Sequence, residues 1–341
     1  MNQRIEVRMG SDSDLPNISG VFDVLDKLQI SYEARVLSAH RTPRAMGSEA
    51  RALEEDGFWA SIAAAGGAAH LPGMTASETV LPVIGLPVRT RAADGMDSLY
   101  SIIQMPDGVP VGTVGIGQAE SAALLATQMA ALADVDARNR IRDYRNLDEL
   151  VEAKAHSFVG IITPREAEIP AQQFNDAKRY VTRMLGAGSS EEFAVASPDL
   201  HNLLEPLREI EYAGATAIVV LADEEAIDLP KRVAAQTDIP VVGVPVFNET
   251  LRSARQEDNL LCRMLTDFTE DGDAVGYPMA GVGINKIVNG ARYAVQIASN
   301  YTDGVRRKLR NEREQMAREV SAKNERLRSL GPARYLMDMK G

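Results

Sequence analysis

The sequence AAGGAAHLPG at residues 64–73 follows a short apolar run, residues 59–63, that is typical of a buried strand. The paired glycines Gly66 and Gly67 permit a sharp turn and let the backbone approach a ligand where a side chain would block it. His70 adds a titratable group at the end of this turn. Alone, the stretch also fits a tight strand-to-helix connection in an α/β sheet. Its function therefore depends on the turns beside it.

A second polar turn, GSDSD at residues 10–14, follows the predicted strand at residues 5–9. Ser and Asp are preferred helix N-caps, and helix N-termini also bind phosphate through free backbone N–H groups. Capping alone could explain the turn. However, Ser11, Ser13 and the two aspartates exceed what one cap requires, which favours a ligand site.

A third turn, SAHRTP at residues 38–43, follows the predicted strand at residues 32–37. A buried Arg needs an anionic partner, so a His beside an Arg is awkward in a core. In a site, Arg41 can bind a phosphate with its guanidinium fork. His40 can move a proton near neutral pH. The pair therefore favours a site for a phosphorylated ligand.

Further strands are predicted at residues 82–88 and 110–114, with an apolar helix at residues 121–132. Strands that alternate with helices predict a parallel sheet within a three-layer α/β fold. Ligands of such folds bind outside the carboxyl ends of the strands. All three polar turns lie at those ends, so we expect them to form one site.

Composition limits the classes of function. The chain has 341 residues and a net charge of −11, from 48 acidic and 37 basic residues, which argues against a nucleic-acid-binding surface. The single cysteine, Cys262, excludes an intrachain disulfide framework and a cysteine-based metal site, and we expect a buried thiol in a helix. Neither a signal peptide nor a membrane-spanning run is visible, so a cytoplasmic location is expected.

Four ordered motifs closely resemble the PurE family of purine biosynthesis: residues 10–14, 38–43, 65–74 and 95–99. The resemblance covers about residues 4–133. The form SAHRTP is similar to the bacterial-type branch, N5-carboxyaminoimidazole ribonucleotide mutase. In the branch that uses carbon dioxide directly, Lys-Gly commonly replaces Arg-Thr.

The strand pattern begins again at residue 157, which indicates an internal repeat. PVVGVPV at residues 240–246 repeats PVIGLPV at residues 82–88 almost letter for letter. We therefore predict two tandem flavodoxin-like three-layer domains, each with a parallel sheet. The predicted parts are a PurE-like catalytic domain at 1–133, a helical linker at 134–156, a degenerate repeat at 157–300 and a charged helical tail at 301–341.

The second copy lacks the site chemistry of the first. Asp199 stands in the place of His40, and Asp228 in the place of His70. Acidic residues there would repel a phosphate and a carboxylate, so we do not expect a second active site for the same substrate. Conversely, Asn289 matches an Asn of the family that the first copy lacks. One hypothesis gives Asn289 a role across the two copies, and the alternative is drift in a surface turn.

The resemblance also implies roles at the site. Ser11 and Arg41 would hold the 5′-phosphate of N5-carboxyaminoimidazole ribonucleotide, and Asp14 its ribose hydroxyls. His40 would protonate the nitrogen as carbon dioxide leaves and then remove the C4 proton of the recarboxylated ring, while His70 lines the pocket. Backbone N–H groups at residues 65–68 would retain the carbon dioxide. The expected substrate-binding set is Ser11, Ser13, Asp14, Ser38, Arg41, Ala65, Gly66, Gly67, Ala68 and Leu71.

The resemblance implies no metal and no cofactor, because a carbamate is already activated. Family members are typically octamers of single domains, so four chains could rebuild an eight-domain assembly.

Two alternatives remain open. The chain could carboxylate aminoimidazole ribonucleotide directly, or it could be a non-catalytic nucleotide-binding scaffold. The shortened turn at Glu120 and Ser121 supports the second. His156 and His201 are expected to be structural.

Overall fold

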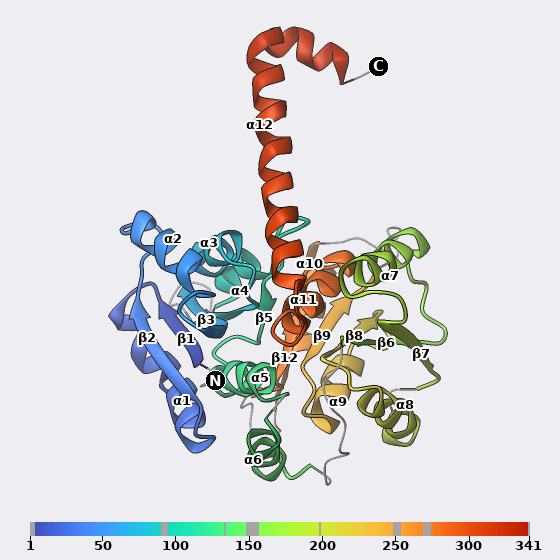
Figure 1. The fold of residues 1–341 in the computed structure, drawn as a ribbon. Coiled ribbons are helices and arrows are strands. Elements are labelled where there is room, and N and C mark those ends of the chain that lie inside the picture. Colours follow the sequence, from blue (N-terminus) through green and yellow to red (C-terminus); the bar gives the residue numbers. More distant parts are fainter. Residues whose placement is uncertain are drawn as a thin grey trace.

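The computed structural model describes residues 4–89, 95–132, 134–147, 157–197, 199–247, 254–268 and 274–339. Figure 1 shows two α/β halves side by side, with a long helix that rises from between them. The end of the predicted linker, residues 148–156 with His156, lies outside the described residues, as do residues 1–3 and Pro198.

The first half contains five strands in the order β2-β1-β3-β4-β5, all parallel to their neighbours within this half. Its strands are β1 (Arg4–Met9), β2 (Ser31–Val36), β3 (Phe58–Gly66), β4 (Val83–Val88) and β5 (Gly112–Thr113). Its helices are α1 (Leu15–Lys27), α2 (Pro43–Ala52), α3 (His70–Glu78), α4 (Met96–Ile103) and α5 (Ala119–Ala131). A short 3₁₀ turn, Asp12–Asp14, precedes α1.

The second half repeats this order as β7-β6-β8-β9-β12. Its strands are β6 (Val159–Pro164), β7 (Ser190–Val195), β8 (Ala217–Ala222), β9 (Val241–Pro245) and β12 (Met279–Gly281). Its helices are α7 (Ala171–Leu185), α8 (Leu200–Tyr212), α9 (Leu229–Gln236), α10 (Ala254–Leu265) and α11 (Ile287–Ala298). The predicted tandem α/β architecture is therefore confirmed.

The two parallel sheets join through their edge strands, which the sequence did not reveal. β5 and β12 pair antiparallel at Thr113 and Gly281, giving one sheet of ten strands. Pairing two edges leaves neither of them exposed to another chain. Glycine at 112 leaves space for Tyr293 of α11, because an added Cβ would lie 2.4 Å from its ring. The Tyr293 hydroxyl donates a hydrogen bond to the carbonyl of Val83 at 3.1 Å, which ties the two halves together.

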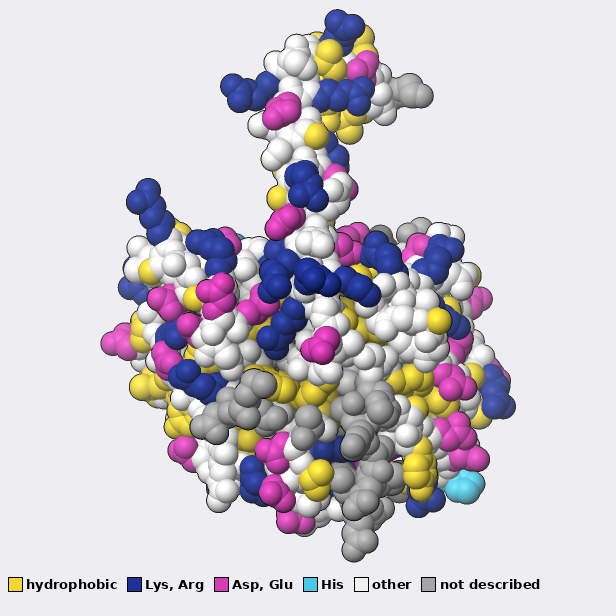
Figure 2. Space-filling view, viewed as in Figure 1, with side chains coloured by type: hydrophobic (Ala, Val, Ile, Leu, Met, Phe, Trp, Pro, Cys, Tyr) yellow, Lys and Arg dark blue, Asp and Glu magenta, His cyan; other side chains and the backbone are white. Residues whose placement is uncertain are grey.

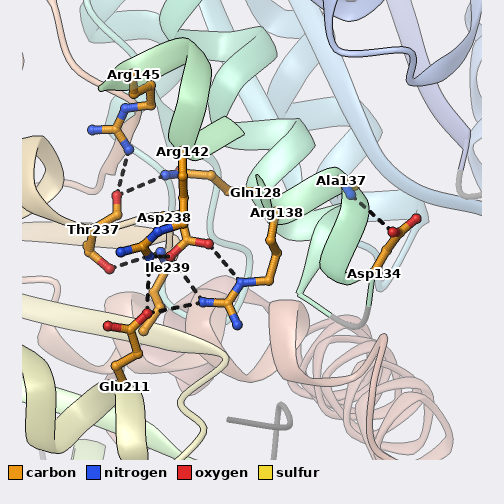
Figure 3. A network of polar contacts seen from close by, with 10 residues as sticks. All are labelled: Gln128, Asp134, Ala137, Arg138, Arg142, Arg145, Glu211, Thr237, Asp238 and Ile239. Carbon is orange, nitrogen blue, oxygen red and sulfur yellow. Dashed lines mark hydrogen bonds and ion pairs between the residues drawn. The ribbon is translucent and has the colours of Figure 1, made fainter. Parts of the chain in front are cut away.

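Helix α6 (Val135–Arg145) follows and contacts the first half and is also bound to the second (Figure 3). Arg138 and Arg142 both contact the buried carboxylate of Asp238, at 2.7 Å each. Both also contact Glu211, whose pKa is raised because burial penalises its charge. Buried charges are tolerated when they are paired and hydrogen-bonded, so this cluster fixes how the halves are oriented.

The predicted charged tail is a helix, α12 (Val305–Asp338), which bends at Gly331. Only its first turns pack against the body: Val305 and Leu309 are its buried residues among those described. Beyond them it projects away from both halves, and Figure 2 shows Lys and Arg side chains gathered where it leaves the body.

Three details differ from the sequence expectation. The strand expected at residues 110–114 is only the two-residue β5, because its register with β4 and β12 covers just those positions. A small antiparallel pair, β10 (Thr266–Phe268) and β11 (Ala274–Gly276), was not expected. Cys262 lies on α10 as predicted but is half-buried. No helix within the described part of the chain could cross a membrane.

Candidate functional site

A cavity of about 860 Å³ opens at the carboxyl ends of β1 to β4 in the first half. The turns after these strands supply its walls. This is where ligands bind in open parallel sheets. The lining residues are Gly10, Ser11, Ser13, Asp14, Asn17, Ser38, Ala39, His40, Arg41, Ala65, Gly66, Gly67, Ala68, His70, Leu71, Val88 and Arg89. The three polar turns of the sequence therefore meet in one place.

The turn after β1 is held by its own side chains. Ser11 Oγ accepts a hydrogen bond from the Ser13 amide at 3.3 Å, and Asp14 Oδ2 accepts one from the Ser11 amide at 3.1 Å. This reciprocal pattern is a capping box. Burial raises the pKa of Asp14, although the amides of Ser11 and Gly10 and the charge of Arg41 act to lower it. The turn is thus held by its own hydrogen bonds without a ligand.

Arg41 connects the turn after β2 to the turn after β1. Its Nη2 donates to the carbonyl of Gly10 at 3.0 Å, and its Nε donates to Ser38 Oγ at 3.3 Å. A guanidinium has five N–H donors, so three remain for a ligand. Arg41 is exposed to the cavity. Because two hydrogen bonds hold the Arg41 side chain in place and its other N–H groups can donate, it suits a phosphate.

His40 and His70 come from different turns and meet at the cavity. His40 Nε2 lies 2.8 Å from His70 Nδ1, and the two rings are nearly perpendicular, at 79°. A hydrogen bond between two ring nitrogens requires one of them to carry the proton and the other to accept. The pair can therefore pass a proton between its members and to a ligand. The sequence had placed both residues in the pocket without foreseeing their contact.

The glycine turn contains one glycine in the left-handed region and one that ends β3. Gly67 has φ = +65°, in the left-handed region that glycine adopts without strain. Its N–H donates to Ser98 Oγ at 2.8 Å, and that hydroxyl donates to the carbonyl of Val88 at 3.0 Å. The Gly67 N–H is consequently occupied, and any retention of carbon dioxide must use other N–H groups of residues 65–68.

Sequence reasoning missed three contributors. Asn17 and Arg89 line the cavity, and Ser98 holds the glycine turn. Arg89 follows β4 directly, as the other polar turns follow their strands, and that position was the available signal. Asn289 lies elsewhere: its amide donates to the carbonyl of Pro106 and accepts from the N–H of Gly108, both at 3.0 Å. It thus joins α11 of the second half to a loop of the first half, away from the cavity lining.

The corresponding turns of the second half enclose a smaller cavity of about 220 Å³. Glu166, Asp223 and Glu225 lie in its wall, with Arg165. Asp228, at the start of α9, stands in the place of His70. It forms an ion pair with Lys231 at 2.9 Å, whereas His70 contacts His40. The second half keeps the scaffold, and the described residues that line its cavity include one arginine and no histidine.

Comparison with known proteins gives consistent matches. The sequence profile described as AIR carboxylase matches residues 4–149 and 190–319. The N5-carboxyaminoimidazole ribonucleotide mutase of Mycobacterium tuberculosis (strain H37Rv) is 53% identical over 152 residues, which are 44% of this chain and 87% of that protein. The mutase of Pyrococcus abyssi is 47% identical over 142 residues, covering 42% and 82%. Among solved structures, Treponema denticola PurE is 26% identical, with a TM-score of 0.39, covering 42% of this chain and 90% of that one.

Proposed function

Because the chain belongs to the AIR carboxylase family, we propose that its first half interconverts N5-carboxyaminoimidazole ribonucleotide and 4-carboxyaminoimidazole ribonucleotide. The protein is then an enzyme of purine biosynthesis. The observation that carries the proposal is the His40–His70 contact in a cavity that also holds Ser11 and Arg41. The same cavity thus combines residues that suit a phosphate with a proton carrier.

In the proposed reaction the 5′-phosphate binds at Ser11, Ser13 and Arg41, and Asp14 accepts hydrogen bonds from the ribose hydroxyls. Protonated His40 gives its proton to the exocyclic nitrogen as the N–C bond to the carboxylate breaks and carbon dioxide forms. The ring carbon C4 then attacks that carbon dioxide, and His40 takes the C4 proton. The proton returns to its starting place, so the cycle needs no net acid or base.

The imidazole suits both steps, because histidine can both give and take a proton near neutral pH. The contact between His40 Nε2 and His70 Nδ1 offers a place to hold the proton between the steps. The small residues Ala65, Gly66 and Ala68 leave room for carbon dioxide against the backbone, next to the rigid Gly67 turn.

The test is to supply each carboxyl source separately. We expect purified protein to convert N5-carboxyaminoimidazole ribonucleotide without bicarbonate, ATP or added metal. Conversion of aminoimidazole ribonucleotide only with bicarbonate would instead assign direct carboxylation. Binding without turnover would indicate a scaffold. The relatives' names favour the first outcome.

Assembly and location also stay predictions. We propose that four chains associate, because each chain already contributes two family units. Sedimentation should give the mass of four chains, and the mass of one would refute the proposal. We also propose a cytoplasmic location, because the proposed substrate is a small ribonucleotide of biosynthesis.

A further inference from the structure

A second arginine lines the cavity and has no partner among the described residues. Arg89 lies directly after β4 and is exposed, and it lines the cavity with Arg41. Arg41 donates to Gly10 and Ser38, whereas Arg89 has no hydrogen-bond or ion-pair partner within the described ranges. An arginine at the wall of a ligand cavity, with no partner among the described residues, is available for an anion.

The two arginines reach the cavity over different strands. The Arg41 guanidinium binds the Gly10 carbonyl at the end of β1, whereas Arg89 follows β4, and the order β2-β1-β3-β4 separates β1 from β4 by two spacings, about 10 Å. A ligand that used both would need two anionic groups at its two ends. A mononucleotide with a carboxylate on its base has this form.

Arg89 lies on the same side of the cavity as the glycine turn. Its neighbour Val88 is in register with Gly66 of β3, and the Ser98 hydroxyl joins the Val88 carbonyl to the Gly67 amide. The Arg89 side chain lies over the turn before α5, because a Cβ added at Gly117 would be 3.7 Å from its Nε. The phosphate-binding turn and Arg41 are on the far side of β3.

We propose that Arg89 binds the carboxylate of the carboxylated ribonucleotide and thereby makes the site selective for carboxylated over uncarboxylated ligands. The inference rests on the proposed function. A guanidinium and a carboxylate form charge-assisted hydrogen bonds with matched planar geometry. Substrate and product both carry a carboxylate at this end, so Arg89 serves both, whereas aminoimidazole ribonucleotide carries only the phosphate.

The test measures binding of 4-carboxyaminoimidazole ribonucleotide and of aminoimidazole ribonucleotide by calorimetry. Arg89→Gln should weaken the carboxylated ligand about tenfold or more, the size expected for charged hydrogen bonds, and change the uncarboxylated ligand less than about twofold. Arg41→Gln should weaken both. Arg44→Gln is the matched control, since Arg44 is an exposed arginine of α2 outside the cavity lining, and it should change neither.

Arg89→Lys keeps the charge without the planar fork and should retain part of the preference. In turnover, Arg89→Gln should raise KM for the carboxylated ribonucleotide more than it lowers kcat. If Arg89→Gln weakened both ligands equally, or neither, the assignment of Arg89 would be wrong and the proposed function would stand. If the wild-type protein bound neither ribonucleotide, both would fail.

Discussion

At the carboxyl ends of its strands, the first half of the molecule encloses about 860 Å³ with a histidine pair and two arginines. The second half has the same strand order, but its cavity is about 220 Å³ and three acidic residues lie in its wall. The turn at residues 65–68 contains a left-handed glycine, whereas no residue of the turn at residues 222–226 has positive φ. The scaffold is therefore shared, and the chemistry depends on a few turn residues.

The largest expected effect separates the two halves directly. His40→Asn removes the proton carrier but keeps a polar side chain, so kcat should fall by at least about a hundredfold while the ribonucleotide still binds. Asp199→Asn, at the corresponding position of the second half, should leave kcat unchanged. Steady-state kinetics and calorimetry on both variants check this. Turnover near the wild-type value in His40→Asn would exclude His40 as the proton carrier, and a loss in Asp199→Asn would give the second half a part in catalysis.

A second prediction tests whether the second half acts as a support. Asp238→Ala removes the buried carboxylate that Arg138 and Arg142 both contact at 2.7 Å and leaves them only the more distant Glu211 (Figure 3). The free energy of unfolding should fall by about 3–5 kcal/mol, measured by urea denaturation. Asp136→Ala, at an exposed position of α6, is the control and should change it little. The kcat of the folded Asp238→Ala protein should persist at low temperature, and its loss would show that the halves are coupled in catalysis.

These contacts also show what the sequence could and could not predict. Apolar runs and glycine turns predicted the strands and the cavity residues, because both signals are local in the chain. The pairing of Thr113 with Gly281 was not predictable, since β5 and β12 are each at most three residues long and lie far apart in sequence. The same applies to Ser98, which occupies the Gly67 amide, and to Asn289, which contacts a distant loop. Such partners are set by packing and leave no pattern in their own segment.

A third prediction concerns the glycine turn that the second half lacks. Gly67→Ala forces a side chain into the left-handed region and should cost about 1–2 kcal/mol of stability. Gly57→Ala is matched in backbone, with φ = +81° and open space around the added Cβ, and should cost a similar amount. Only Gly67→Ala should also lower kcat, because Gly67 lines the cavity. An equal loss of kcat in both variants would make the effect one of stability alone.

The smallest expected effect concerns whether the buried carboxylate of Asp14, a residue of the proposed site, lowers the thermal stability of the protein. Burial raises the pKa of Asp14 above its ordinary value of 3.8, so the charged carboxylate is less favourable in the folded protein than in the unfolded chain. This destabilisation is present at neutral pH and disappears as the pH falls below both pKa values. Asp14→Asn removes the charge while its amide oxygen can still accept the Ser11 N–H.

Asp14→Asn should therefore raise the Tm by about 1–2 °C at pH 7, and the gain should shrink as the pH approaches 4. Binding of the ribonucleotide should weaken at the same time, because the ribose loses a charged acceptor. Glu166→Gln, an exposed position in the corresponding turn, should leave the Tm unchanged at both pH values. A gain from Asp14→Asn alone would mean that the functional turn is held in a less stable state than its degenerate copy. An unchanged or lower Tm at pH 7 would mean that the hydrogen bonds from Gly10 and Ser11 outweigh the burial of the charge.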